Sequence, residues 1–198
     1  MKLVESASAE QLLCLERRSF LKIATAAIVP AVFMPPAFAG GQTDFWSKPR
    51  RVWLQRRVAG RIEEVNEVYF ADGKLLRDPY IRACRLLRDV RAGEAVQMSP
   101  VLLDILCGIQ GVAIAHGIDR PLITNSGYRS PKTNSATEGA AKNSLHMQGR
   151  AWDGRMPDYP AKMLAQIAQY LQGGGVGLYV ASNFCHVDDG RLRTWRGA

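Results

Sequence analysis

The sequence has no apolar run that approaches the roughly 20 residues of a membrane-spanning helix, which excludes a polytopic membrane protein. It also has no internal repeat and no low-complexity tract, which excludes a repeat architecture. Acidic residues are few, since 26 Lys and Arg stand against 18 Asp and Glu and leave a net charge of +8. The 198 residues, 47% of them hydrophobic, suffice for one domain with a core, so a wholly disordered chain is excluded as well.

The sequence also lacks two kinds of motif: paired cysteine motifs and phosphate-binding glycine loops. The four cysteines have no paired CxxC spacing, which argues against a zinc finger or a disulfide framework. Cys84 and Cys107 fall on predicted helices, where we expect buried thiols, and a disulfide between them is left open. The glycine run at 173–175 follows a predicted helix and precedes a predicted strand, the reverse of the order in a phosphate-binding loop. It therefore predicts a helix end and a tight turn.

The first 39 residues have the features of an export signal. A charged segment over 16–22 contains two consecutive arginines, 23–34 is uncharged and apolar, and 37–39 is a small-x-small cleavage pattern. The arginine pair resembles a twin-arginine signal, which implies export by the twin-arginine machinery to the periplasm. The predicted parts are a signal peptide over 1–39, a flexible leader over 40–50 and one domain over 51–198.

The remaining pattern predicts an α+β domain, with helices packed on a small, irregular antiparallel sheet. Amphipathic spacing predicts a helix over 80–90, and Ser99-Pro100 predicts the start of another that runs to about His116. A third helix is expected over 160–171. The predicted strands are 52–55, 64–70, 121–124, 151–156, 176–180 and 184–188.

Three histidines are candidates for chemistry, and two of them have a suitable setting. His116 lies where a helix is expected to end, and we interpret it as a cation favoured by the helix dipole. His146 precedes a glycine turn into the strand that carries Asp153, and His186 lies on the last predicted strand. Two imidazoles and one carboxylate form a three-ligand set suited to catalytic zinc, although this spacing alone does not require a metal. Asp188 shares the strand face of His186 and could accept a proton or orient the imidazole.

Four motifs follow one another in an order that is typical of a known family. They are SGYRSPKTN at 126–134, NSLHMQGRAWD at 143–153, GVGLY at 175–179 and FCHVD at 184–188. This string resembles the exported zinc D-Ala-D-Ala metallopeptidase superfamily, whose fold is shared with hedgehog signalling domains. Within it the chain looks like the murein endopeptidase K branch, and the likeness runs from about 51 to 195.

The resemblance implies roles for particular residues. Arg129 matches the arginine that holds the scissile carbonyl oxygen or a substrate carboxylate, and a fixed guanidinium is suited to either task. Ser126 and Asn134 are then expected to bind substrate or to support the site through hydrogen bonds. The residues that match the zinc ligands are His146, Asp153 and His186.

The sequence departs from the better-known relatives just before His186. They have a catalytic Glu, Asp or His there, whereas this chain has Ala181, Ser182 and Asn183, none of which acts as a general base at neutral pH. We therefore expect Asp188, the nearest carboxylate, to be the general base.

The resemblance implies a zinc-dependent hydrolase that cleaves peptide bonds in peptidoglycan stem peptides or cross-links, as an endopeptidase or a carboxypeptidase. The basic balance suits such a polyanionic substrate. The missing upstream carboxylate supports an alternative, an inactive peptidoglycan-binding or scaffold protein that retains the fold. Nucleic-acid binding is not expected, because the arginines are spread along the chain without interleaved aromatic residues. We expect a monomer.

Overall fold

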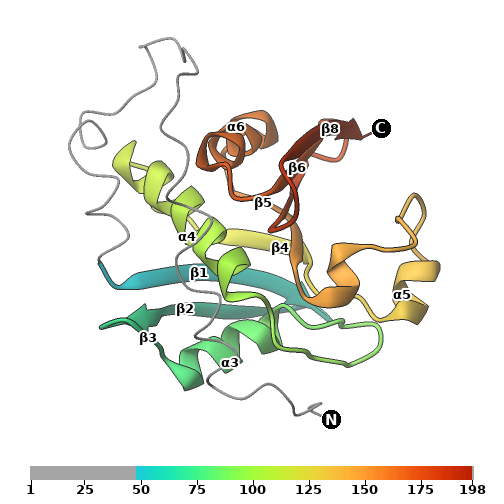
Figure 1. Ribbon diagram of the computed structural model, residues 1–198, viewed down its shortest axis with the longest axis horizontal. Helices are drawn as coiled ribbons and strands as arrows, with labels where there is room; N and C mark the ends of the chain where they lie inside the picture. Colours follow the sequence, from blue (N-terminus) through green and yellow to red (C-terminus); the bar gives the residue numbers. More distant parts are fainter. Residues whose placement is uncertain (1–47, 198) are drawn as a thin grey trace.

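The structure is a computed structural model that describes residues 48–197 (Figure 1). The expected signal peptide over 1–39, and most of the leader over 40–50, lie outside the described residues. The elements in chain order are β1 (Arg50–Val58), β2 (Arg61–Ala71), β3 (Lys74–Leu75), α3 (Arg77–Leu86), α4 (Pro100–Ala115), β4 (Leu122–Ser126), α5 (Pro131–Ser135), the 3-10 helix η3 (Leu145–Gln148), β5 (Ala151–Arg155), α6 (Ala161–Leu171), β6 (Gly175–Tyr179), β7 (Phe184–Asp188) and β8 (Arg193–Gly197).

The strands form one sheet of eight, in the order β3-β2-β1-β4-β5-β7-β6-β8. Most neighbours are antiparallel, but β1 pairs with β4 in parallel and β6 pairs with β8 in parallel. The α+β single domain is confirmed, but the sheet is larger than expected and mixed rather than antiparallel. The sheet is larger because the short strands β3 and β8 were not predicted. It is mixed because β4 returns to β1 after two helices, as a parallel crossover requires, and because β8 pairs with β6 in parallel.

The helices α3, α4 and α6 cover one face of the sheet, whereas the short η3 lies beside β5 on the other face. Alternate strand residues such as Val52, Leu122, Trp152 and Val187 belong to the same buried cluster as the apolar residues of α3, α4 and α6. Their neighbours along each strand point the opposite way, toward a surface that we call the open face. Because Asp153 follows Trp152, this alternation places it on the open face.

The helix that fills the centre of the covered face is α4. Ser99 caps its N-terminus by accepting from the N–H of Leu102, and Pro100 occupies the first turn, as the sequence indicated. Ten of its 16 residues are buried, because α6 packs beside it and β1 lies beneath it. The segment ends at His116, whose Nδ1 lies 2.8 Å from the carbonyl oxygen of Val112. No helix in residues 48–197 is both long enough and apolar enough to cross a bilayer.

The helix expected over 80–90 is displaced toward the N-terminus, as α3, and ends at Leu86. Asp89 explains the early end. Its carboxylate accepts from the N–H groups of Arg91, Ala92 and Ser130 at 2.9–3.2 Å, so the chain turns there instead of continuing as a helix. This carboxylate also anchors the segment that carries Arg129.

The three cysteines of the described residues are buried and free, so Cys84 and Cys107 form no disulfide here. Burial raises the pKa of all three thiols, that of Cys107 to about 11. Cys185 lies on the covered face, as strand alternation predicted, and acts as a core residue.

Gly154 is required by the packing around the site strand. A Cβ at this position would overlap both the Trp152 indole and the carbonyl oxygen of Ile123 on the neighbouring β4. The large indole two residues earlier fills the space on the covered face, and its Nε1 donates to the hydroxyl of Thr124 at 3.0 Å. Trp152 and Gly154 therefore form one packing unit on either side of Asp153.

We predict that Gly154→Ala destabilises the domain by about 1–3 kcal/mol, because the added methyl group must displace the indole or the strand backbone. Thermal unfolding followed by circular dichroism measures the change. Thr194→Ala, at an exposed position of β8, is the control and should leave the midpoint nearly unchanged. Equal midpoints for the two variants would contradict the proposed packing.

Candidate metal centre

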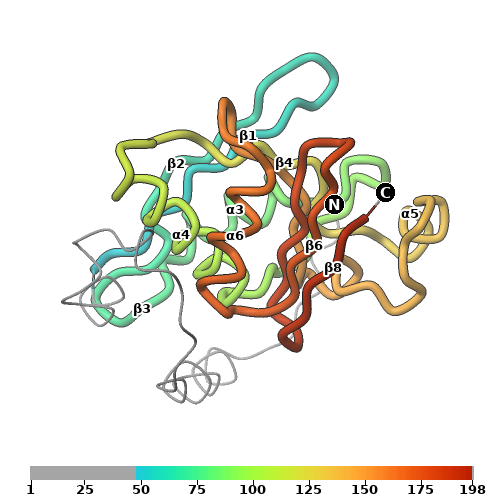
Figure 2. Tube along the Cα trace, turned by 90° about the horizontal axis from the view of Figure 1, so that it is seen from above, coloured from blue at the N-terminus to red at the C-terminus, as the bar shows by residue number. Residues whose placement is uncertain are grey.

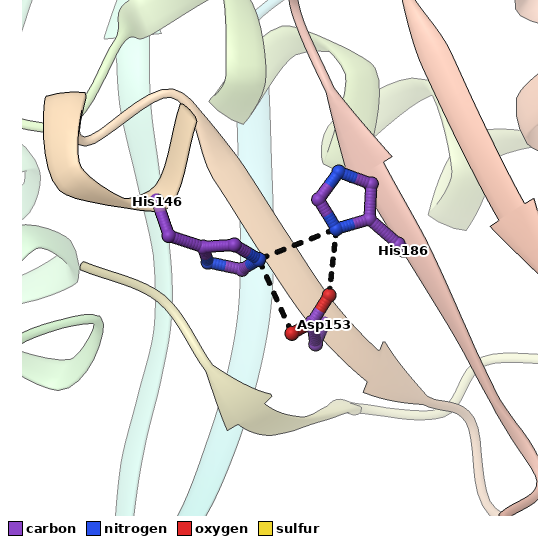
Figure 3. A group of neighbouring side chains, drawn as sticks. All are labelled: His146, Asp153 and His186. Atoms are coloured by element: carbon purple, nitrogen blue, oxygen red, sulfur yellow. Dashed lines mark hydrogen bonds and ion pairs between the residues drawn. The ribbon is translucent and has the colours of Figure 1, made fainter. Parts of the chain in front are cut away.

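Two imidazoles and a carboxylate converge on the open face, from three elements (Figure 3). His146 comes from η3, Asp153 from β5 and His186 from β7. Asp153 and His186 are direct partners in the antiparallel pairing of β5 with β7. The inward atoms are close: His146 Nε2 lies 3.2 Å from His186 Nδ1 and 3.2 Å from Asp153 Oδ2, and His186 Nδ1 lies 2.7 Å from Asp153 Oδ1.

The sequence around His146 dictates how its ring reaches the strand. Ser144 caps η3 and accepts from the N–H of His146 at 3.3 Å. Gly149 ends the turn at φ 67°, a left-handed conformation, and a side chain there would also meet the carbonyl oxygen of Gln97. The chain can therefore reverse within a few residues and enter β5 with Asp153 beside the imidazole.

Hydrogen bonds on the outer side of each ring fix both tautomers. His146 Nδ1 faces the carbonyl oxygen of Gly127 at 2.6 Å, so this nitrogen must donate. His186 Nε2 faces Asp188 Oδ2 at 2.9 Å and donates in the same way. In its neutral form each ring consequently turns an unprotonated nitrogen toward Asp153, which is how histidines are oriented in metal sites.

This arrangement fits a zinc ion. Ligand atoms held tetrahedrally at 2.0–2.1 Å from zinc lie about 3.3 Å apart, close to the separations measured among these three residues. A cation between the two imidazole nitrogens and the carboxylate would accept all three lone pairs, while Arg129 already pairs with one oxygen of Asp153. Solvent reaches the site at His186, whose side chain is 12% exposed, against 2% for His146.

The electrostatics of the three groups also favour a cation. Burial raises the pKa of Asp153, but the charge and hydrogen bonds of His146 and His186 outweigh it and hold the pKa well below its ordinary value. Burial lowers the pKa of His186, but hydrogen bonds to Asp153 and Asp188 raise this pKa by more, so it lies above its ordinary value. The carboxylate therefore stays ionised, and a positive charge between the ligands is stabilised.

Arg129 lies at the edge of this site. Its terminal nitrogen NH2 forms a short ion pair with Asp153 Oδ2, and its Nε donates to the hydroxyl of Ser126 at 2.8 Å. Its backbone N–H donates to the carbonyl oxygen of His146 at 3.2 Å. The Arg129 side chain is 14% exposed, and the bonds to Asp153 and Ser126 hold its guanidinium at the edge of the site.

Comparison with known proteins agrees with this geometry. Residues 46–195 match the family described as peptidoglycan L,D-endopeptidase MepK. The chain belongs to this family. It is 31% identical over 183 residues to peptidoglycan L,D-endopeptidase MepK of Escherichia coli (strain K12), an alignment that covers 90% of this chain and 96% of that protein.

Two further relatives carry similar names. The MepK protein of Shigella flexneri is also 31% identical over 183 residues, with 90% of this chain and 96% of that protein covered. The probable peptidoglycan L,D-endopeptidase MepK of Haemophilus influenzae is 39% identical over 116 residues, which cover 57% of this chain and 61% of that protein. The family resemblance inferred from the sequence motifs is thus confirmed.

Asp188 does not have the surroundings of a general base. It is fully buried, and its oxygens accept from His186 Nε2, from Arg193 at 2.6 and 3.0 Å, and from the N–H groups of Gly175 and Gly190. Burial raises its pKa, but the hydrogen bonds of His186 and Arg193 prevail and hold the pKa well below the usual range. This geometry corresponds to orientation of the His186 ring, and the expected role of Asp188 as general base stays a prediction.

The two residues expected to bind substrate, Ser126 and Asn134, have different surroundings. Asn134 is only 5% exposed, and its amide donates to the carbonyl oxygen of Ala141 at 3.0 Å, so it ties a loop rather than facing a ligand. Ser126 contacts Arg129 through its hydroxyl and is suited to position the guanidinium. The sequence motif found the right segment, but it could not tell inward-facing from outward-facing polar groups.

Sequence reasoning missed two groups beside the site. The carbonyl of Gly127 fixes His146, and a backbone acceptor has no signature in the sequence. Trp195, on the unpredicted β8, lies with its ring centre 5.1 Å from that of His186 and donates from Nε1 to the Tyr179 hydroxyl at 3.2 Å. The spacing of Arg193 and Trp195, two residues apart after a turn, would have indicated a short strand with both side chains on one face.

We predict that Asp188→Asn weakens zinc binding about 10–100-fold, the usual cost of removing a hydrogen-bond partner behind a ligating histidine. Competition with a chromogenic chelator measures the affinity. The matched control is Asp189→Asn, because Asp189 pairs with Arg150 instead and should leave the affinity unchanged. Equal affinities for both variants would contradict the orienting role.

Proposed function

We propose that the protein is a zinc-dependent endopeptidase that cleaves peptide bonds in peptidoglycan and acts in the periplasm. The observation that carries this proposal is the convergence of His146 Nε2, His186 Nδ1 and an Asp153 oxygen, with both rings fixed from behind. Three protein ligands with solvent access on one side are the pattern of catalytic rather than structural zinc sites. Membership in a peptidoglycan endopeptidase family supports the substrate class.

Each residue of the candidate centre has a distinct role in the proposed reaction. His146, Asp153 and His186 would hold the ion, which when bound polarises a carbonyl group and lowers the pKa of water. Arg129 offers its guanidinium to the negative charge that develops on the carbonyl oxygen during attack. Ser126 keeps that guanidinium in place through the bond to Nε, and Asp188 keeps the His186 ring from rotating.

One observation favours the alternative, an inactive binding or scaffold protein. Among the described residues, Asp153 and Asp188 are the carboxylates at the centre, and both are engaged by His186 and by an arginine. Neither is free to take a proton from water. Release of muropeptides from purified sacculi, followed by mass spectrometry, separates the two proposals: the enzyme gives new fragments, and the scaffold gives binding without fragments.

The periplasmic location rests on the sequence of the first 39 residues. The twin-arginine pattern, the short apolar stretch and the cleavage pattern support export by the twin-arginine machinery. Peptidoglycan lies in the compartment that such a signal reaches. A basic domain suits that polymer, because its peptide carboxylates are attracted to a positive surface.

We predict that the purified domain holds about one zinc ion per chain, and that His146→Ala loses both the ion and the release of muropeptides. Zinc is measured by elemental analysis after dialysis. His116→Ala is the control, since this exposed histidine ends α4, and should retain zinc and activity. Full zinc occupancy in His146→Ala would contradict the assigned ligand set.

We predict that Arg129→Ala lowers kcat about 10²–10³-fold while zinc stays bound, as expected for loss of a donor to a developing negative charge. Single-turnover cleavage of a cross-linked peptide measures the effect. Arg129→Lys should recover only part of the rate, because an ammonium group cannot contact Ser126 and the site together. An unchanged kcat in Arg129→Ala would remove this residue from the mechanism.

A further inference from the structure

A groove of about 820 Å³ adjoins the candidate centre. Its lining includes Gln55, Arg57 and Ile123, which alternate with buried residues of β1 and β4 and therefore lie on the open face. Ile62, paired with Arg57 across the β1–β2 hairpin, forms part of one wall and is 59% exposed. This hairpin projects beyond the rest of the sheet (Figure 2). On the other side the lining includes Asp158 and Asn183.

The groove is positively charged. Three exposed arginines line it, and in residues 48–197 none of their side chains has a hydrogen bond or an acidic partner. The acidic side chain in the lining is that of Asp158. Two arginines in and just after α3 differ, because Arg82 pairs with Glu67 and Arg88 pairs with Glu63. Within the described part of the chain, the three arginines that line this groove without a side-chain partner are Arg57, Arg91 and Arg155.

A fourth arginine fixes the shape of this groove. Arg56 is only 8% exposed, and its guanidinium donates to the carbonyl oxygens of Arg88 at 2.6 Å and Asn125 at 3.2 Å. These bonds link the end of β4 to the turn after α3, which carries Arg91. The groove wall is consequently held before any ligand arrives, and its free guanidiniums are presented by an ordered backbone.

The groove lining comes within two residues of the candidate centre along β5. Arg155 follows Asp153 by two residues on β5, so both side chains leave the same face about 7 Å apart. Asn125, at the other end of the groove lining, directly precedes Ser126, which holds Arg129. A ligand in the groove would therefore lie one or two peptide residues from a bond placed at the metal ligands.

We infer that this groove binds carboxylate groups of the substrate peptide on one side of the scissile bond. The inference rests on the proposed function, since the ligand is the peptide that would be cut. Three guanidiniums without partners, beside one acidic group, favour an anionic ligand over a neutral one, and planar carboxylates match the fork of arginine. The groove thus selects acidic stem peptides over their amidated forms.

The test compares two synthetic cross-linked peptides, one with free side-chain carboxylates and one with the same groups as carboxamides. The zinc-loaded protein should cleave the carboxylate peptide with a kcat/KM at least about 10-fold higher, since hydrogen bonds to charged groups are the stronger ones. The variant R57Q/R91Q/R155Q should lose this preference. The variant R57K/R91K/R155K should keep part of it.

The control variant R77Q/R85Q/R120Q removes the same number of charges from exposed arginines outside the groove, and it should retain the full preference. Equal loss in both glutamine variants would overturn the inference in favour of general charge attraction. Equal kcat/KM values for the two peptides with the unchanged protein would overturn it directly.

Binding of the same peptides, labelled and followed by fluorescence anisotropy, separates this inference from the proposed hydrolysis. A preference for the carboxylate peptide in binding, lost in R57Q/R91Q/R155Q and without any cleavage, supports the groove and contradicts the proposed hydrolysis. Cleavage of both peptides without any preference supports hydrolysis and contradicts the groove.

Discussion

The candidate centre depends on the register between β5 and β7. That register sets Asp153 opposite His186. The two residues are 33 positions apart in the sequence, but they are direct neighbours on adjacent strands. A slip of one residue would turn His186 into the core and bring Cys185 to the open face. Two features of the covered face oppose such a slip. The Trp152 indole packs against Gly154, and Val187 is buried; a slip would disrupt that packing and expose Val187. Core packing therefore fixes how Asp153 and His186 face each other in the candidate metal centre.

Strand β7 also carries a buried negative charge, on Asp188, which is neutralised by an arginine of the last strand, β8. Asp188 is ionised and without exposure to solvent, and such a group is stable only when its oxygens are fully hydrogen-bonded. Arg193 supplies two of these bonds, and it comes from β8, which joins the sheet beside β6. The C-terminal strand is thus tied to the centre through one buried carboxylate, and Trp195 is carried to the side of His186 by the same pairing.

Much of the site could be predicted from the sequence, because strand alternation has a period of two. It was enough to place His186 and Asp188 on one face and Cys185 on the other. Alternation predicts which face a side chain lies on, but it does not predict how deeply that side chain is buried. It therefore could not reveal that Asp188 accepts hydrogen bonds from Arg193 and from two backbone N–H groups. The β8 strand was missed because Arg193–Gly197 has no run of apolar residues, and its stability comes from pairing with β6. The early end of α3 depends on the contacts of Asp89 with Ser130, which lies 41 residues away.

The division between a covered and an open face explains how one sheet combines stability with binding. Helices remove one face from solvent, and this burial holds the strands while the other face stays free for polar side chains. Across the open face, the strand order places guanidiniums over β1 and β5, the ligands over β5 and β7, and the rings of Tyr179 and Trp195 over β6 and β8. Five strand spacings from β1 to β8 amount to about 24 Å, the length of about seven extended residues. A peptide that lies across the strands therefore meets the guanidiniums, the candidate metal ligands and the aromatic rings in the order that the sheet sets.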